Sequence, residues 1–162
     1  MAKITNDLMA IINILNYMGE LSEYKNTSEF LYNSDHTTFN NSLPIFIKIG
    51  TASRKVSNRI IERYTKVPWK TMKDFINIYD SDCELLNRTV IHDLIENKLP
   101  CAVEVLEKIV SKELNEKNFS FKEYKTFSSS QIYNYVNFNR INANLLQLKI
   151  RDLFHENTWQ RL

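Results

Sequence analysis

The chain has 162 residues, of which 43% are apolar and 12% aromatic, and its formal net charge is +2. These values supply enough core-forming side chains for one domain with an appendage, and they leave little room for two full domains. Two glycines and three prolines are too few for a turn-rich β-sandwich, so the composition favours an all-α fold.

The composition also narrows the kinds of site that can be expected. Cys83 and Cys101 lie far apart, and neither has a neighbouring histidine, so the sequence predicts no metal site and no disulfide framework. Nothing in the pattern indicates a cofactor. Residues 1–7 reach polar and acidic side chains before any sustained apolar run, which is not typical of a secretory signal. Because no apolar stretch is long enough to span a bilayer, we expect a cytoplasmic protein without a membrane partner.

The first half of the chain predicts two long helices. The first begins at the N-cap Thr5 and has an apolar face at helical spacing. Its members are Leu8, Ile11, Ile12, Leu15 and Met18. The second is predicted from about residue 38 to residue 64, with Pro44 marking its start or a kink. Gly50 in the middle of this helix indicates that another backbone approaches closely.

Shorter helices are predicted to follow. Pro68 is typical of a first helical turn, and the helix that it opens would carry Trp69, Met72, Phe75, Ile76 and Tyr79. Residues 81–84 fit a capping box for a new helix, and Leu99-Pro100 opens another. Residues 119–130 read as a linker, and a final helix follows, whose aromatic and apolar residues suit either the core or an interface. The sequence therefore predicts a helical bundle over residues 1–117 and a C-terminal helical extension over residues 118–162, which packs on the bundle or on a partner.

Basic residues are concentrated in one part of the chain. The segment from Lys48 to Lys73 contains eight basic residues and one acid, Glu62, so its net charge is +7. The rest of the chain has a net charge of −5. At i, i+4 spacing on one helix, three of the cations form a stripe that could contact phosphates or an acidic protein, and three more extend the basic segment. The stripe is Lys55, Arg59 and Arg63, and the extension is Lys66, Lys70 and Lys73. A solvated helix face explains the same pattern, and the absence of interleaved aromatics argues against base stacking.

Several short motifs occur in an order and spacing typical of one family. In chain order they are Ile49-Gly50-Thr51-Ala52, Arg54-Lys55, Arg63-Tyr64, Val67-Pro68-Trp69, Leu99-Pro100 and the apolar run Val103–Ile109. This series resembles the HepT-like ribonucleases of the HEPN superfamily, over roughly residues 3 to 112. The resemblance implies an antiparallel up-and-down helical bundle that usually dimerises.

The same resemblance indicates that the family's catalytic pair is missing. Active members cut RNA with an Arg and a His at the dimer cleft, and the match assigns these positions to Ile76 and Ser81. An aliphatic side chain cannot stabilise the charge that develops on phosphate, and a serine cannot transfer a proton near neutral pH without a separate base. A tyrosine that partner nucleotidyltransferases adenylylate falls on Cys83. Of the family's catalytic motif only the polar residue remains, as Asn77, which would mark the former cleft.

Arg88 and His92 are an alternative catalytic pair. They lie four residues apart on a predicted helix and therefore share a face. A half-buried structural histidine beside a surface arginine explains the same spacing, and the match places His92 where the family commonly has a core tryptophan.

Two functions remain open from the sequence. The first is a HepT-like protein without the ribonuclease pair, which acts by binding protein or RNA within a toxin–antitoxin or phage-defence module. Its expected partners are a second copy of the chain in a homodimer, a nucleotidyltransferase-type antitoxin or another protein, and RNA. The alternative is a divergent HEPN toxin that acts as a metal-independent endoribonuclease.

Overall fold

The computed structural model describes residues 6–24, 37–80 and 87–160, which form helices and turns without a strand. The expected all-α fold is confirmed. In chain order the elements are α1 (Asp7–Leu21), η1 (Ser22–Tyr24), α3 (Thr37–Ser53), α4 (Asn58–Arg63), α5 (Trp69–Asp74), η2 (Phe75–Asn77), α6 (Arg88–Asp93), η3 (Leu94–Lys98), α7 (Leu99–Asn115), α8 (Phe121–Ser128), η4 (Gln131–Tyr133) and α9 (Phe138–Gln160). In these ranges no helix has the length and apolar character needed to cross a bilayer.

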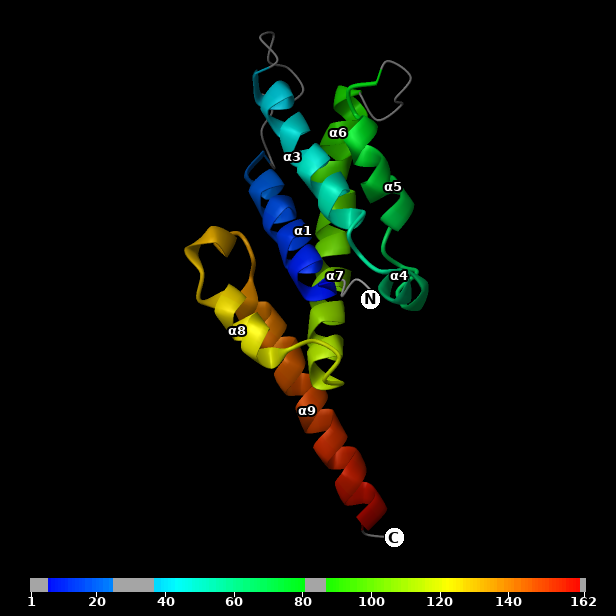
Figure 1. Cartoon of the computed structure of the whole chain (residues 1–162), viewed down its shortest axis with the longest axis vertical. Helices are drawn as coiled ribbons and strands as arrows, with labels where there is room; N and C mark the ends of the chain where they lie inside the picture. Colours follow the sequence, from blue (N-terminus) through cyan, green and yellow to red (C-terminus); the bar gives the residue numbers. More distant parts are fainter. Residues whose placement is uncertain (1–5, 25–36, 81–86, 161–162) are drawn as a thin grey trace, which may run out of the picture.

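The helices form an up-and-down bundle (Figure 1). α1 and α3 pack side by side and run in opposite directions, α5 and η2 pack against α3, and α7 packs against α1. α9 packs against α7 as far as Asp152, which accepts a hydrogen bond from the side chain of Asn115 at 2.9 Å, and its end then projects past the bundle. The first and last parts of the chain therefore meet on α7.

One hydrophobic core joins the bundle to the C-terminal extension. Its buried side chains come from α1, α3, α5, η2 and α7, and also from α8 and α9. Among them are Leu8, Ile11, Phe46, Ile49, Met72, Phe75, Leu106, Val110, Tyr124, Ile141 and Leu145. The apolar face expected for the first helix is confirmed, since all five of its members are buried. The N-cap of α1 is Asn6, whose side chain accepts a hydrogen bond from the backbone N–H of Met9 at 2.9 Å, whereas Thr5 lies outside the described residues.

The predicted single helix over residues 38–64 is wrong, because α3 ends at Ser53 and α4 begins at Asn58. The carboxylate of Asp7 accepts hydrogen bonds from the backbone N–H of Ser57 at 2.7 Å and from its hydroxyl at 2.6 Å. These bonds replace the partner that the Ser57 N–H would have in a continuous helix, and they hold the turn against the start of α1. Pro44 lies inside α3.

Gly50 allows the close contact that its position in a helix indicated. A Cβ atom at Gly50 would lie 2.8 Å from the backbone nitrogen of Ile76 and 3.1 Å from the carbonyl oxygen of Met72. Real Cβ atoms do not approach a backbone this closely, so the glycine lets α5 and η2 rest directly on α3. This prediction is confirmed.

The helices expected to begin near residues 81 and 99 differ from the prediction. Residues 81–84 lie outside the described residues, and the described helix begins at Arg88 with the N-cap Asn87. There is no break before Leu99, because α6 continues through the π-helical segment η3 into α7. Pro100 explains the π turn, since its ring lacks an N–H and crowds the carbonyl of residue i−4, which is Glu96 in η3.

The predicted linker over residues 119–130 contains a helix. Ser120 caps α8 by accepting a hydrogen bond from the backbone N–H of Glu123 at 3.2 Å. Tyr124 is 2% exposed and donates its hydroxyl proton to Asn142 Oδ1 at 2.6 Å, which ties α8 to α9. The linker prediction is therefore wrong, because residues 121–128 form a helix whose Tyr124 is part of the core.

The segment between α8 and α9 is fastened to α1. The side-chain amide of Asn16 donates a hydrogen bond to the carbonyl oxygen of Ile132 at 3.3 Å and accepts one from the backbone N–H of Tyr135 at 3.1 Å. One turn further along α1, a Cβ atom at Gly19 would lie 2.4 Å from the carbonyl oxygen of Tyr135 and 2.7 Å from its Cβ. Only glycine therefore lets this segment lie against α1.

Gly19→Ala is expected to lower the free energy of unfolding by about 2 kcal/mol, because the added methyl group forces the backbone of Tyr135 away from α1. The better helix propensity of alanine offsets only about 1 kcal/mol of the strain. Urea unfolding followed by circular dichroism measures the change. Thr51→Ala, at an exposed position of α3, is the control and should change stability by less than about 0.5 kcal/mol. A Gly19→Ala protein as stable as the wild type would show that the contact is not constrained.

Candidate functional site

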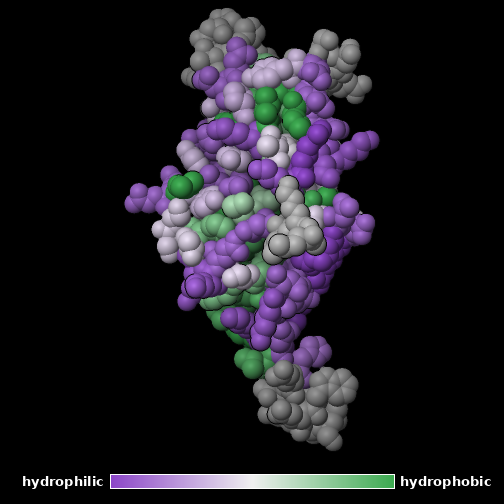
Figure 2. All heavy atoms as spheres, viewed as in Figure 1, coloured by the Kyte–Doolittle hydropathy of each residue, from purple (hydrophilic) through white to green (hydrophobic). Residues whose placement is uncertain are grey.

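The distal part of α9 has an exposed apolar face. Leu146, Ile150 and Leu153 are 59%, 44% and 59% exposed, and their i, i+4, i+7 spacing places them on one side of the helix. Nearer the start of α9, Ile141 and Leu145 are buried in the core. Figure 2 shows hydrophobic surface on α9 where the helix leaves the bundle. Such a stripe on a projecting helix is typical of a protein-binding surface.

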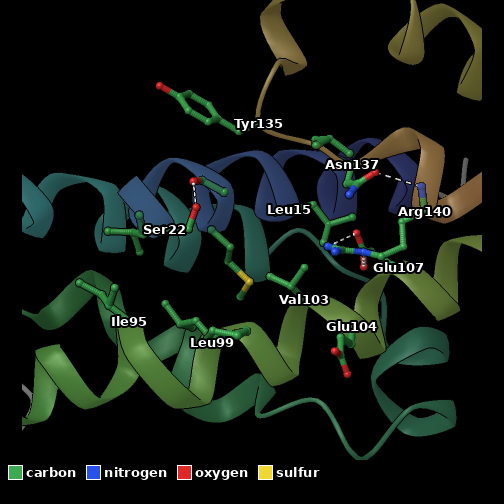
Figure 3. Close-up of a pocket in the computed structure, with 15 residues that line it drawn as sticks. Leu15, Ser22, Ile95, Leu99, Val103, Glu104, Glu107, Tyr135, Asn137 and Arg140 are labelled. Atoms are coloured by element: carbon green, nitrogen blue, oxygen red, sulfur yellow. Dashed lines mark hydrogen bonds and ion pairs between the residues drawn. The ribbon is translucent and has the colours of Figure 1, made fainter. Parts of the chain in front are cut away.

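A pocket of about 340 Å³ lies between α1, η3, α7 and the segment that leads into α9 (Figure 3). Its apolar lining comes mainly from Leu15, Met18, Leu21, Ile95, Leu99 and Val103. In Figure 3 Ser22 and Ile95 lie toward one end of the pocket, and Glu107 and Arg140 meet at the other. The ring of Tyr135 points away from the cavity.

An ion pair between the buried Glu107 and the half-exposed Arg140 closes one end of this pocket. Glu107 is 2% exposed, and its two carboxylate oxygens accept hydrogen bonds from Arg140 Nε at 2.6 Å and Nη2 at 2.8 Å. These bonds raise the pKa of Arg140 above its ordinary value, with a smaller contribution from the charge of Glu104. Glu104 lines the pocket and has no ion-pair partner in the described part of the chain. The lining therefore contains two carboxylates and one guanidinium.

A second carboxylate on α7 neutralises two cations of the basic segment. The side chain of Glu113 is 0% exposed, and its oxygens lie 2.9 Å from Arg59 Nη1 and 3.3 Å from Arg63 Nη1. Asn118 donates a further hydrogen bond to Glu113 at 2.7 Å. Arg63 also pairs with Glu116 at 2.8 Å, and this hydrogen bond lowers the pKa of Glu116. Arg59 and Arg63 therefore lie at the surface and are already paired with Glu113 and Glu116.

Tyr64 lies beside the same cluster. Burial, followed by the negative charge of Glu113, raises the pKa of Tyr64 to about 12. Its ring lies 5.3 Å from the Arg63 guanidinium carbon and 5.9 Å from Lys112 Nζ. The phenol thus remains protonated near neutral pH and packs beneath the cations, as expected for a structural residue.

The remaining cations of the basic segment do not form one helical stripe. Lys55 lies in the turn after α3 and not on the helix that carries Arg59 and Arg63, so the predicted i, i+4 stripe is wrong. Lys66 lies in the turn before α5, and Lys70 and Lys73 lie on α5. Within the described ranges these four lysines have no ion pair.

The positions that the family resemblance singled out are only partly described. Ile76 is half-buried in η2, and its backbone packs against Gly50. Asn77 follows and is exposed. Ser81 and Cys83 lie outside the described residues, so the structure does not place them relative to Ile76.

The alternative pair lies on α6. Arg88 is the first residue of this helix and His92 lies one turn later, as the sequence predicted. His92 Nε2 lies 3.7 Å from Glu96 Oε1, and its side chain is 29% exposed. The histidine therefore has a carboxylate neighbour in η3, which suits a structural role.

Known proteins provide no further guide to the identity of these sites. No protein-family model, curated protein or solved structure matches the chain. The function therefore has to be inferred from this chain's own surfaces.

Sequence reasoning missed Glu113, Asn16 and Gly19, which hold distant segments of the chain together. Leu106, Val110 and Glu113 follow one another at i, i+4, i+7 spacing, so a carboxylate lies on the buried stripe. A charged residue at such a position indicates a buried partner, because an unpaired carboxylate is very costly to bury. That signal was available for Glu113. No comparable local signal identified Asn16 or Gly19 as contacts of a segment more than a hundred residues away.

Proposed function

We propose that the protein acts by binding another protein through the distal part of α9, and that its first partner is a second copy of the chain. The observation that carries this proposal is the exposed apolar face of Leu146, Ile150 and Leu153. These three side chains stay exposed although neighbouring positions of α9 contact the bundle, since Asp152 accepts a hydrogen bond from Asn115 and Lys149 Nζ lies 5.6 Å from the centre of the Phe121 ring. A short helix without tertiary packing is only marginally stable in water, so a partner that covers this face would stabilise the helix.

The spacing of the apolar residues favours a pair of helices. Ala143, Leu146, Ile150 and Leu153 follow one another at alternating intervals of three and four residues. This places Ile150 at an a position of a heptad and the two leucines at d positions, a combination that favours parallel two-stranded coiled coils. This seam of a and d residues between the two helices is short, so we expect a reversible dimer with a dissociation constant in the micromolar range.

The motifs similar to HepT-like proteins support a binding function. Members of that family usually dimerise, and here the position matched to the catalytic arginine is Ile76. We therefore propose a HepT-like protein without its ribonuclease pair, within a toxin–antitoxin or phage-defence module. A nucleotidyltransferase-type antitoxin is the further partner that this family would imply.

RNA binding is the weaker candidate. Glu113 and Glu116 already neutralise Arg59 and Arg63, so loss of RNA binding on mutation of these arginines would not distinguish a contact from misfolding. Of the six cations that the sequence singled out for binding, the four left for an anionic partner are Lys55, Lys66, Lys70 and Lys73. Binding through them would weaken steeply as salt concentration rises.

The proposal is tested by Ile150→Glu, which is expected to raise the dissociation constant of the dimer at least about 100-fold, because it would bury two like charges in the seam. Sedimentation velocity over a concentration series measures this constant. Arg151→Glu is the control, because it makes a larger change of charge at an exposed position outside the seam. It should leave the constant within about threefold of the wild-type value.

Results of two kinds would contradict the proposal, on the association of the chain and on RNA cleavage. One is a wild-type chain that remains monomeric at several hundred micromolar, or a dimer that Ile150→Glu does not weaken. The other is metal-independent cleavage of RNA by the purified protein that is abolished by His92→Ala, which would support the ribonuclease alternative.

A further inference from the structure

The surface where α8 meets α9 combines an exposed aromatic ring with positive charge. The ring of Phe121 is 45% exposed, and its centroid lies 5.0 Å from Lys125 Nζ and 5.6 Å from Lys149 Nζ. Beside it, a shallow surface hollow is lined by two lysines and three hydroxyl-bearing residues, which are Lys122, Lys125, Thr126, Ser129 and Ser130. We call Phe121, Lys122, Lys125 and Lys149 the α8 patch. In Figure 1, α8 lies on the opposite side of the bundle from α4 and α5, which carry much of the basic segment.

The positive charge of the α8 patch is not neutralised by the chain itself. The acid on α8, Glu123, accepts a hydrogen bond from the side-chain amide of Asn6. On α9, Asp152 accepts one from the side-chain amide of Asn115 at 2.9 Å. In the described part of the chain, the three lysines of the patch form no ion pair. Two ammonium groups therefore lie around one ring without a counter-ion, which favours the approach of an anion.

An exposed aromatic ring among lysines suits a single strand of nucleic acid. A base that stacks on an aromatic side chain contributes about 1–3 kcal/mol, and the phosphates of the strand pair with the neighbouring cations. An exposed cation–π contact contributes only about 0.5–1 kcal/mol, so a base can replace one ammonium group over the Phe121 ring. The displaced ammonium group then pairs with a phosphate. An acidic peptide would satisfy the lysines but would make no use of the ring.

We propose that the α8 patch binds a single-stranded nucleic acid, with a base on Phe121 and phosphates at Lys122, Lys125 and Lys149. Stacking and phosphate contacts do not require a 2′-hydroxyl, so RNA and DNA strands share the chemistry that the patch recognises. The proposal uses no residue of the distal α9 face and no lysine of the basic segment. It therefore goes beyond the proposed association of two chains, and either proposal can fail alone.

The experiment measures the binding of fluorescein-labelled strands of about 12 nucleotides to the full-length protein by fluorescence anisotropy, at about 50 mM salt. Oligothymidylate and oligouridylate carry bases on a DNA and an RNA backbone, and an abasic strand carries the same phosphates without bases. We expect both base-bearing strands to bind at least about fivefold more tightly than the abasic strand, because one stacked base contributes about 1 kcal/mol or more. A preference between the two would identify the natural strand as DNA or RNA.

Matched variants separate the ring from the charges. Phe121→Leu should weaken binding of both base-bearing strands about fivefold and leave the abasic strand unchanged. Lys125→Gln with Lys149→Gln should weaken all three strands, and it should reduce the slope of log K against log salt by about 1.4, because two phosphate contacts are lost. Lys70→Gln with Lys73→Gln removes the same charge from α5 and is the control. It should change each affinity by less than about twofold.

The inference is overturned if the abasic strand binds as tightly as the base-bearing strands, because charge alone would then explain the binding. It is also overturned if the α5 control weakens binding as much as the α8 double substitution, or if no strand binds. Tighter binding of a labelled oligoglutamate than of either base-bearing strand would assign the patch to an acidic protein instead. The substituted lysines of the patch are exposed, so the fold should stay intact by circular dichroism, and their test remains decisive even if Phe121→Leu does not fold.

Discussion

Replacing Arg59 and Arg63 together with methionine is expected to lower the free energy of unfolding by about 3 kcal/mol. The double substitution leaves the carboxylate of Glu113 fully buried without a cation, with the amide of Asn118 as its remaining side-chain donor. The two arginine side chains are 49% and 33% exposed, so solvent screens part of their attraction to Glu113. The expected loss of stability therefore lies at the low end of the range for a broken buried ion pair. Urea unfolding followed by circular dichroism measures the change.

The matched control removes the same number of positive charges elsewhere in the basic segment. Lys66→Met with Lys70→Met takes away two cations that have no ion pair in the described part of the chain, and it should change stability by less than about 0.5 kcal/mol. A third variant adds Glu113→Met to the arginine double mutant. It should recover more than half of the lost stability, because an apolar side chain leaves no buried charge. Equal stability of the two double mutants would show that Glu113 does not need its arginines.

Tyr124→Ala is expected to lower the free energy of unfolding by about 4 kcal/mol, the usual cost of truncating a fully buried aromatic residue. The ring of Tyr124 lies 5.8 Å from Phe138 and 6.0 Å from Phe121, measured between centroids, so its removal leaves a cavity between α8 and α9. Tyr124→Phe retains the ring and loses the hydroxyl contact with Asn142, which should cost about 1 kcal/mol. Chemical denaturation of both variants tests this order, and equal losses would contradict it.

The hydroxyl of Tyr124 also makes the stability depend on pH. Burial raises its pKa to about 12 from the ordinary value of 10.0, so the folded state holds the proton more tightly than the unfolded state. Its contribution is therefore complete below pH 10 and is lost as the pH rises toward 12, by an amount on the order of 2 kcal/mol. Tyr124→Phe should reduce this alkaline loss, whereas Tyr79→Phe, at a position 57% exposed, should not. The same alkaline loss in all three proteins would contradict the assignment.

Much of the fold could be predicted from the sequence because it depends on local spacing. The apolar residues of α1 and α7 recur every three or four positions, and the periodicity that identifies a helix also identifies the face that the structure buries. Gly50 was informative for the same reason, since a glycine inside an otherwise regular helix needs an explanation in packing. α8 could have been found as well, because Ser120 and Glu123 fit a capping box.

The contacts that define the candidate sites could not be predicted, because their partners are distant in the chain. The break between α3 and α4 depends on Asp7, which is 50 residues from Ser57. Arg59 meets Glu113 across 54 residues, so the sequence could count the basic residues but could not tell which of them were already paired. The sequence predicted a final helix with apolar residues, but only the packing against α7 shows that Ile141 and Leu145 are covered while Leu146 and Ile150 are not.

The π-helical segment that precedes Pro100 changes how positions on this long helix should be compared with other proteins. A π turn holds more residues than an α turn, so every side chain beyond it is rotated about the helix axis from where a regular helix would place it. The motifs that resemble HepT-like proteins include Trp69 and Pro100, so a comparison with that family would cross residues 94–98, where this rotation occurs. Residues that align by number across that turn therefore need not point in the same direction around the helix axis. The direction in which α6 presents its side chains therefore depends on a proline in the next helix. In a protein without that proline, the residue equivalent to His92 would point toward a different neighbour.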